Sequence, residues 1–167
     1  MRESCVARRL TASVRFLVKA ISLPKFTLPF EFIIDGPPVS QQARRRERVR
    51  QWRDEVRRVA EQHWPTGELP VTEPIMLTIV YFYDNVSMDI DNLPKPILDA
   101  LKGLVYLDDT QITDVVCRKR NLNSDLRVEN PSGVLAEGFS RGNEFLYIVV
   151  EDAPDQEVIY SWKRPSR

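Results

Sequence analysis

The feature that most restricts the fold of this 167-residue chain is the nine-residue run IMLTIVYFY at 75–83. Both alternating sets of side chains in this run are apolar, and most are β-branched or aromatic residues, which favour strands. A strand that is apolar on both faces needs cover on both faces, so we expect a central, buried strand of a sheet. The length of the chain suits one domain with a sizeable core.

The remaining periodicities predict an α+β fold, with one mixed sheet of about four strands and helices packed against it. The first strand ends where Gly36, Pro37 and Pro38 stop strand pairing. The predicted elements, in the order β-α-β-α-β-β, are strands at 30–35, 75–83, 111–120 and 143–152 and helices at about 41–63 and 92–104. Residues 121–142 are predicted to form a polar loop.

The two ends of the chain differ from the middle. Residues 1–26 contain six basic residues and one acid, and their short apolar run is interrupted by Lys19, unlike a secretory signal. We expect a basic, disordered extension at 1–26, with an organellar transit peptide as the alternative reading. A single domain at 27–152 and a tail at 153–167 complete the predicted organisation.

The composition excludes several classes of protein. Two cysteines form no disulfide framework, which favours a reducing, cytoplasmic setting. The single histidine, His63, argues against a metal site or a catalytic triad built on histidine. No apolar run approaches the roughly 20 residues that a membrane span requires, so no membrane association is expected.

Two short segments concentrate aspartates around the second predicted helix, MDIDNLPK at 88–95 and LDDTQITD at 107–114. Asp89 and Asp91 are two residues apart, a spacing that points both side chains to one side of extended backbone. Asp91 or Asn92 is the expected N-cap of the helix. The prolines at 94 and 96 are expected in the first helical turn, the only part of a helix that accepts them.

These acids supply the ligands of a hard-cation site. Mg²⁺ binds a few carboxylate oxygens, and here Asp89 and Asp91 would be joined by Asp108 or Asp109 from the turn after the helix. Lys95, in the first helical turn, would meet a phosphate oxygen, which completes a set suited to metal-assisted phosphodiester hydrolysis. Spacing alone leaves open the alternative that these aspartates are only turn and cap residues.

The segment DIDNLPKPILDALKGLVYLDDTQI at 89–112 resembles the signature of the RusA family of Holliday-junction resolvases. That signature combines a D-x-D-N-x-x-K start, a helix containing D-A-L and an L-D-D-x-Q segment. GPPVSQQ at 36–42 also resembles the stretch that follows the first strand of the family. The similarity covers about residues 28–151.

The resemblance implies a homodimeric endonuclease, dependent on Mg²⁺ with Mn²⁺ as a substitute, that resolves four-way DNA junctions in recombination and repair. Its catalytic residues would be Asp89, Asp91, Lys95 and Asp109. The same three aspartates would bind the metal, with Asp108 as a further candidate ligand. A twofold dimer suits two paired cuts. A non-cleaving branched-DNA-binding module and a metal-dependent nuclease of relaxed specificity are the alternatives.

Basic residues gather in two places, the Arg-rich helix at 44–58 and CRKR at 117–120. Beside a nuclease motif we interpret them as phosphate contacts, and the alternative is a solvated surface with ion pairs along the helix. The predicted DNA-contact residues are Arg44, Arg45, Arg46, Arg48, Arg53, Arg118, Lys119 and Arg120. Alternation along the strand would point some of the last three into solvent in either case.

Overall fold

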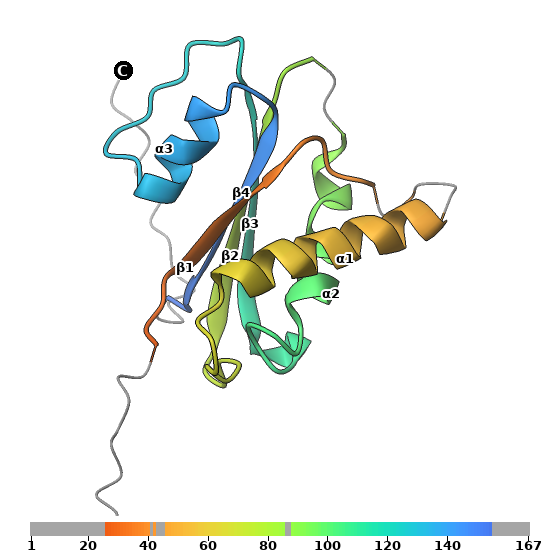
Figure 1. Ribbon diagram of the computed structural model, residues 1–167, viewed down its shortest axis with the longest axis vertical. Coiled ribbons are helices and arrows are strands. Elements are labelled where there is room, and N and C mark those ends of the chain that lie inside the picture. Colours follow the sequence, from red (N-terminus) through yellow and green to blue (C-terminus); the bar gives the residue numbers. More distant parts are fainter. Residues whose placement is uncertain (1–25, 41, 43–45, 86–87, 155–167) are drawn as a thin grey trace, which may run out of the picture.

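The computed structural model describes residues 26–40, 42, 46–85 and 88–154 of the chain. The predicted extension and tail therefore lie almost entirely outside the described residues. The strands are β1 (Phe30–Asp35), β2 (Ile75–Tyr83), β3 (Ile112–Asn121) and β4 (Phe145–Asp152) (Figure 1). The helices are α1 (Arg46–His63), α2 (Pro94–Leu101) and α3 (Gly133–Ser140), with 3₁₀ turns η1 (Ile90–Asn92) and η2 (Asp109–Gln111).

The four strands form one mixed sheet in the order β1-β4-β2-β3. β2 runs parallel to β3 and antiparallel to β4, and β1 pairs antiparallel with β4. Leu77 and Ile79 of β2 are fully buried, so the prediction of a central strand is confirmed. The predicted α+β class, with about four strands and helices against the sheet, is also confirmed.

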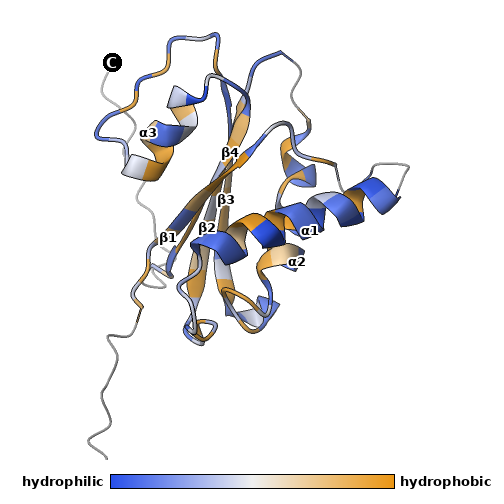
Figure 2. Cartoon of the chain, in the orientation of Figure 1, coloured by the Kyte–Doolittle hydropathy of each residue, from blue (hydrophilic) through white to orange (hydrophobic). Residues whose placement is uncertain are grey.

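The two faces of the sheet are covered by different helices. α1 and α2 cover the face that carries Leu77, Ile79 and Ile148, and together they enclose the larger core. α3 covers part of the opposite face, where Phe82 and Phe145 form a smaller core (Figures 1 and 2). None of the helices in the described part of the chain has the length and apolar character needed to cross a membrane.

α1 is amphipathic and ties α2 to the sheet. Trp52, Val56 and Ala60 are buried on its inner side, while its outer side is largely hydrophilic (Figure 2). Arg57 reaches across to α2, where its Nη1 donates to the carbonyl oxygens of Ala100 (3.1 Å) and Lys102 (3.0 Å). These bonds satisfy carbonyls that the end of a helix leaves without partners, and they hold α2 in place.

The start of α2 differs from the prediction. The N-cap is Leu93, not Asp91 or Asn92, and no side chain caps this end. Residues 90–92 form their own turn, η1, and α2 then begins directly at Pro94, whose missing N–H is tolerated in the first turn. The helix ends at Leu101, before the predicted 104, because Gly103 (φ 74°) reverses the chain.

The predicted loop at 121–142 is wrong in one part, because it contains α3. Ser132 caps this helix, its Oγ accepting a hydrogen bond from the Leu135 N–H (3.2 Å). The apolar side of α3 packs on the smaller core. The helix is only eight residues long and contains Gly133 and Gly138, which are poor helix formers, so its sequence pattern is weak.

Candidate functional site

Asp89 and Asp91 lie on the exposed side of the turn that leads into α2. Asp89 has extended backbone (φ −64°, ψ 138°), but Asp91 is inside η1, so the expected extended spacing of this pair is wrong. Asn92 is 8% exposed and Leu93 is fully buried, so these two residues anchor the turn in the core. The side chain of neither aspartate makes a hydrogen bond or ion pair with any residue that the structure describes, which leaves both carboxylates open to a cation.

Lys119, in β3, contacts the backbone at the start of this acidic turn. Its Nζ donates a hydrogen bond to the carbonyl oxygen of Met88 (2.8 Å), directly before Asp89. In the register of the sheet Lys119 lies beside Tyr81, on the face covered by α1 and α2. The structure therefore gives this predicted DNA-contact residue an anchoring role at the start of the site.

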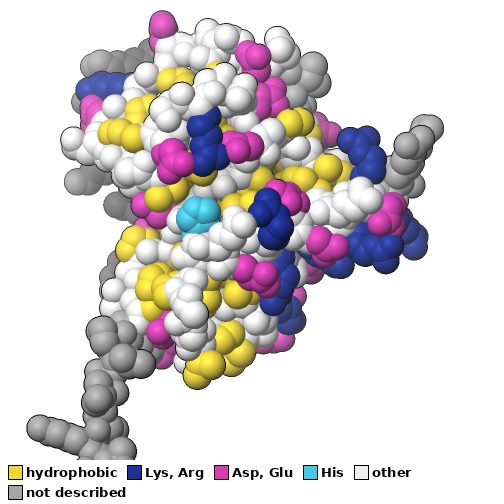
Figure 3. All heavy atoms as spheres, viewed as in Figure 1, with side chains coloured by type: hydrophobic (Ala, Val, Ile, Leu, Met, Phe, Trp, Pro, Cys, Tyr) yellow, Lys and Arg dark blue, Asp and Glu magenta, His cyan; other side chains and the backbone are white. Residues whose placement is uncertain are grey.

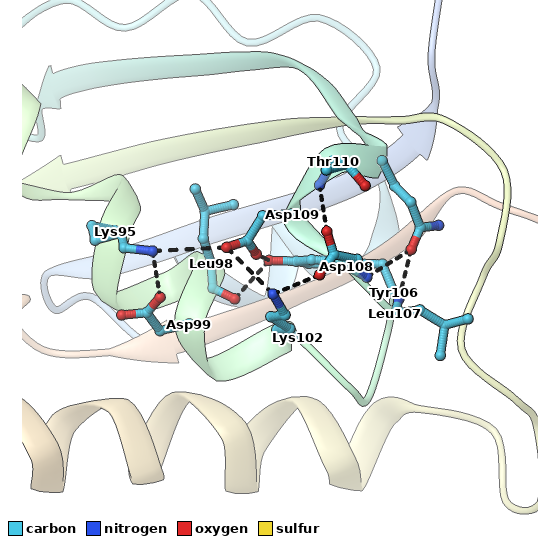
Figure 4. A network of polar contacts seen from close by, with 10 residues as sticks. Lys95, Leu98, Asp99, Lys102, Tyr106, Leu107, Asp108, Asp109 and Thr110 are labelled. Atoms are coloured by element: carbon cyan, nitrogen blue, oxygen red, sulfur yellow. Dashed lines mark hydrogen bonds and ion pairs between the residues drawn. The ribbon is translucent and has the colours of Figure 1, made fainter.

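A lysine–aspartate cluster, formed by Lys95, Asp99, Lys102, Asp108 and Asp109, lies along α2 and the following turn (Figure 4). Lys95 Nζ is 2.7 Å from Asp99 Oδ1 and 3.9 Å from Asp109 Oδ2. The hydrogen bond with Asp99, aided by both negative charges, raises the pKa of Lys95 above its usual value. Lys95 is therefore a charged ammonium over the whole neutral range.

Asp109 points at the centre of the cluster. Its Oδ2 is 3.6 Å from Lys102 Nζ, and its Oδ1 accepts a long hydrogen bond from the Tyr106 hydroxyl (3.4 Å). The hydroxyl has a single hydrogen, which is directed mainly at the Leu98 carbonyl oxygen in α2 (2.7 Å), so the contact with Asp109 is the weaker of the two. Tyr106 is fully buried, and this burial raises the pKa of its hydroxyl, which stays a proton donor.

Asp108 is held more firmly than Asp109. Its Oδ1 accepts the Thr110 N–H (3.1 Å) as the cap of η2, and its Oδ2 is 2.9 Å from Lys102 Nζ. The Lys102 hydrogen bond, with that of Thr110, lowers the pKa of Asp108 to about 2. The contacts of Asp109 are longer, at 3.4, 3.6 and 3.9 Å, so the geometry favours Asp109 over Asp108 as the carboxylate available to a cation.

The donor set suits a hard divalent cation by its chemistry, since Asp89, Asp91 and Asp109 offer only carboxylate oxygens. All three side chains are exposed. Within the described residues, however, no three or more Asp, Glu, His or Cys side chains are grouped as metal ligands. The structure brings Asp109 to Lys95, while Asp89 and Asp91 make no contact with the lysine–aspartate cluster.

Basic side chains gather at the N-terminal half of α1 (Figure 3). An open hollow of about 390 Å³ lies between α1 and α2 and is lined by Arg46, Val49, Arg50, Arg53, Pro96 and Asp99. Arg50 pairs with Glu47. Arg46, Arg48 and Arg53 form no ion pair with the residues described, so they are available to phosphate. Arg44 and Arg45 lie outside the described residues.

The predicted CRKR patch is divided between the two faces of the sheet. Arg118 lies beside Val80 and Arg120 beside Phe82 in the β2–β3 register. Both arginines line a hollow of about 530 Å³ on the face of α3. Lys119, between them, faces α1 and α2. Arg118 and Arg120 therefore face away from the lysine–aspartate cluster, as alternation along a strand requires.

Four residues of the site were not predicted as functional, namely Asp99, Lys102, Tyr106 and Gln111. Asp99 and Gln111 stand in the D-A-L and L-D-D-x-Q parts of the motif, which was the only signal for them. Their roles depend on contacts across a turn and between segments, so residue spacing does not reveal them.

A family model for the endodeoxyribonuclease RusA matches residues 37–129, which is more than half of the chain. The match begins just after β1 and spans α1 and both acidic segments, so it includes the whole candidate site. The chain belongs to the RusA endodeoxyribonuclease family. RusA-family enzymes act on branched DNA junctions and generally depend on divalent metals. No curated protein matches the sequence.

Proposed function

We propose that this protein is a divalent-metal-dependent endodeoxyribonuclease that resolves four-way (Holliday) junctions by paired phosphodiester hydrolysis, in DNA recombination and repair. The observation that carries the proposal is Lys95, a charged lysine in the first turn of α2, 3.9 Å from Asp109. It follows by a few residues two aspartates whose side chains have no ion pair among the described residues. The family match over 37–129 supports the same reaction. Such a protein would work in the cytoplasm, at the nucleoid.

In this proposal Asp89, Asp91 and Asp109 hold the cation, which is Mg²⁺ with Mn²⁺ as a substitute. The bound cation would supply an activated water and neutralise negative charge on the phosphate. Asp108 would keep its role as the cap of η2, because Thr110 and Lys102 occupy its oxygens.

Lys95 would donate a hydrogen bond to a non-bridging oxygen of the scissile phosphate, where negative charge develops in the transition state. Asp99 holds the ammonium group at 2.7 Å and raises its pKa, so the lysine is oriented and charged before DNA arrives. A donor fixed in advance needs little reorganisation during the reaction.

Arg46, Arg48 and Arg53 would bind backbone phosphates next to the cleaved bond, since the hollow lined by Arg46 and Arg53 also includes Asp99. Binding through phosphates weakens steeply as salt rises. A homodimer would place two identical sites on opposing strands of a junction, which is the requirement for paired cuts.

A junction-cleavage assay tests this function. Wild-type protein should cut a labelled four-way junction in a Mg²⁺-dependent way, whereas Asp91→Asn should bind the junction and cut it at least about a hundredfold more slowly, because a ligand is lost. Asp125→Asn, an exposed aspartate on the α3 side, is the matched control and should cut normally.

Other outcomes identify the alternatives. A wild-type protein that binds the junction without cutting it under any metal condition would be a branched-DNA-binding module. Equal cutting of junction, flap and linear duplex would indicate a nuclease of relaxed specificity. Near wild-type cutting by Asp91→Asn would remove Asp91 from the site.

A further inference from the structure

The side-chain amide of Gln111 joins two segments that are about forty residues apart. Its Oε1 accepts hydrogen bonds from the N–H groups of Leu107 (2.8 Å) and Asp108 (2.8 Å). Its Nε2 donates to the carbonyl oxygens of Val71 (2.8 Å) and Glu73 (3.1 Å). A glutamine amide offers two acceptor sites and two hydrogens, so this side chain is fully used on backbone groups.

The turn that Gln111 holds has few apolar contacts of its own. Leu107 is 52% exposed, and the three residues after it are also exposed. Backbone bonds at its base, such as Val71 N–H to the Val105 carbonyl oxygen (2.7 Å), tie only the preceding segment. The amide of Gln111 is therefore a main tether between the turn and the chain entering β2.

Asp109 directly follows the two N–H groups that Gln111 binds. The position of its carboxylate, between Lys95 and Lys102, depends on where the 107–109 backbone lies relative to α2. On the α2 side, residues 108 and 109 are held by side-chain contacts, the 2.9 Å ion pair of Lys102 with Asp108 and the 3.4 Å hydrogen bond from Tyr106 to Asp109. Release of the Gln111 amide would let the turn move and carry Asp109 away from the cluster.

We infer that Gln111 is a positioning residue for the cation site, and that it acts by fixing the backbone that presents the Asp109 carboxylate. This inference rests on the proposed function, in which Asp109 is a metal ligand. Gln111 itself would contact neither DNA nor the cation, because its amide is used on backbone groups. Residues that orient a metal ligand typically change metal affinity or activity by about 10- to 100-fold when they are replaced.

Two substitutions separate this role from a general contribution to stability. Gln111→Leu removes all four hydrogen bonds while keeping a side chain of similar size. Gln111→Glu keeps an acceptor for Leu107 and Asp108 but loses the donors to Val71 and Glu73. Gln62→Leu, at an exposed position in α1, is the matched control. Circular dichroism establishes which variants fold, and the Glu variant carries the test if the Leu variant does not.

There are three readouts. The first is Mn²⁺ binding to the DNA-free protein, measured by electron paramagnetic resonance. The others are amide hydrogen exchange of residues 107–111 and the Mg²⁺ concentration for half-maximal cleavage. We expect Gln111→Leu to raise the dissociation constant for Mn²⁺ about tenfold or more and the Mg²⁺ requirement in parallel. Exchange at Leu107 and Asp108 should become faster. Gln62→Leu should match the wild type in all three readouts.

A folded Gln111→Leu variant with wild-type Mn²⁺ affinity overturns the inference, even if its melting temperature falls, because that result describes a purely structural residue. Failure of the proposed function looks different. In that case the wild-type protein does not cut any branched DNA, whereas the effect of Gln111 on Mn²⁺ binding can still be measured.

Discussion

Asp109 has two lysines within 4 Å, whereas Asp89 and Asp91 have no charged partner among the described residues. This difference sets the electrostatics of the site. If a cation bound all three carboxylates, Asp89 and Asp91 would be free to bind it, whereas the charge of Asp109 would already be partly neutralised by the two lysines. In the proposed site, Lys95 and Lys102 would therefore lower the affinity for the cation, and they would limit repulsion between the acids when no cation is bound.

At the residue scale, Asp99→Asn tests the orientation of Lys95. The change removes the negative charge of the 2.7 Å ion pair, whose hydrogen bond is the largest cause of the raised Lys95 pKa. The pKa of Lys95 should fall towards its usual 10.5. Junction cleavage at neutral pH should slow by about ten- to a hundredfold, because Lys95 is a catalytic group in the proposed function and its displacement would be costly.

The Lys95 pKa can be followed by NMR titration of its side chain, and cleavage is measured in parallel at saturating Mg²⁺. Asp54→Asn, an exposed aspartate in α1, serves as the control. An unchanged Lys95 pKa together with a wild-type cleavage rate would show that Asp99 does not position the lysine.

At the element scale, α3 depends on a close approach that only glycine permits. A Cβ atom on Gly138 would lie 2.5 Å from Cε2 of Phe145, whose ring is buried in the smaller core. The ring cannot move without disturbing Phe82 and Phe139, which it contacts. Glycine therefore fits here despite its low helix propensity.

Gly138→Ala should destabilise the protein by about 1–3 kcal/mol, the usual effect of overpacking a core. Gly133→Ala is a matched control in the same helix, because a Cβ there meets no atom within 4 Å. Urea unfolding measures both free energies. Equal stability of the two variants would contradict the packing described for α3.

At the scale of the whole molecule, the basic residues belong to two opposite faces of the sheet. Arg46 and Arg53 line the hollow beside α2, and Arg118 and Arg120 line the hollow on the α3 side. A junction bound at the lysine–aspartate cluster meets the first pair directly. The arginines on the α2 side should therefore contribute more to DNA affinity than those on the α3 side. The net charge of zero does not reveal this difference.

Arg46→Ala and Arg53→Ala should each weaken junction binding and lower the salt dependence of binding by about one phosphate contact. Arg118→Ala and Arg120→Ala should leave both quantities nearly unchanged. Fluorescence anisotropy with the Asp91→Asn protein as the common background measures binding without cleavage. The reverse pattern would place the DNA on the α3 face.

Residue patterns alone determined a large part of this protein. The doubly apolar run at 75–83 predicted the central strand β2, and the proline positions predicted that Lys95 lies in the first turn of α2. The spacing of the acids also predicted a hard-cation donor set, which stays a prediction. These features follow from periodicity and backbone chemistry over a few residues, which a sequence displays directly.

Only the tertiary structure decided how those residues are used. It separated Asp108, which is bound by Thr110 and Lys102, from Asp109, and it placed Lys119 and Arg118 on opposite faces. It also showed Gln111 holding the acidic turn against residues 71–73, and α3 forming from a weak pattern. These outcomes depend on contacts between segments tens of residues apart. Local sequence patterns cannot predict which distant groups will come into contact.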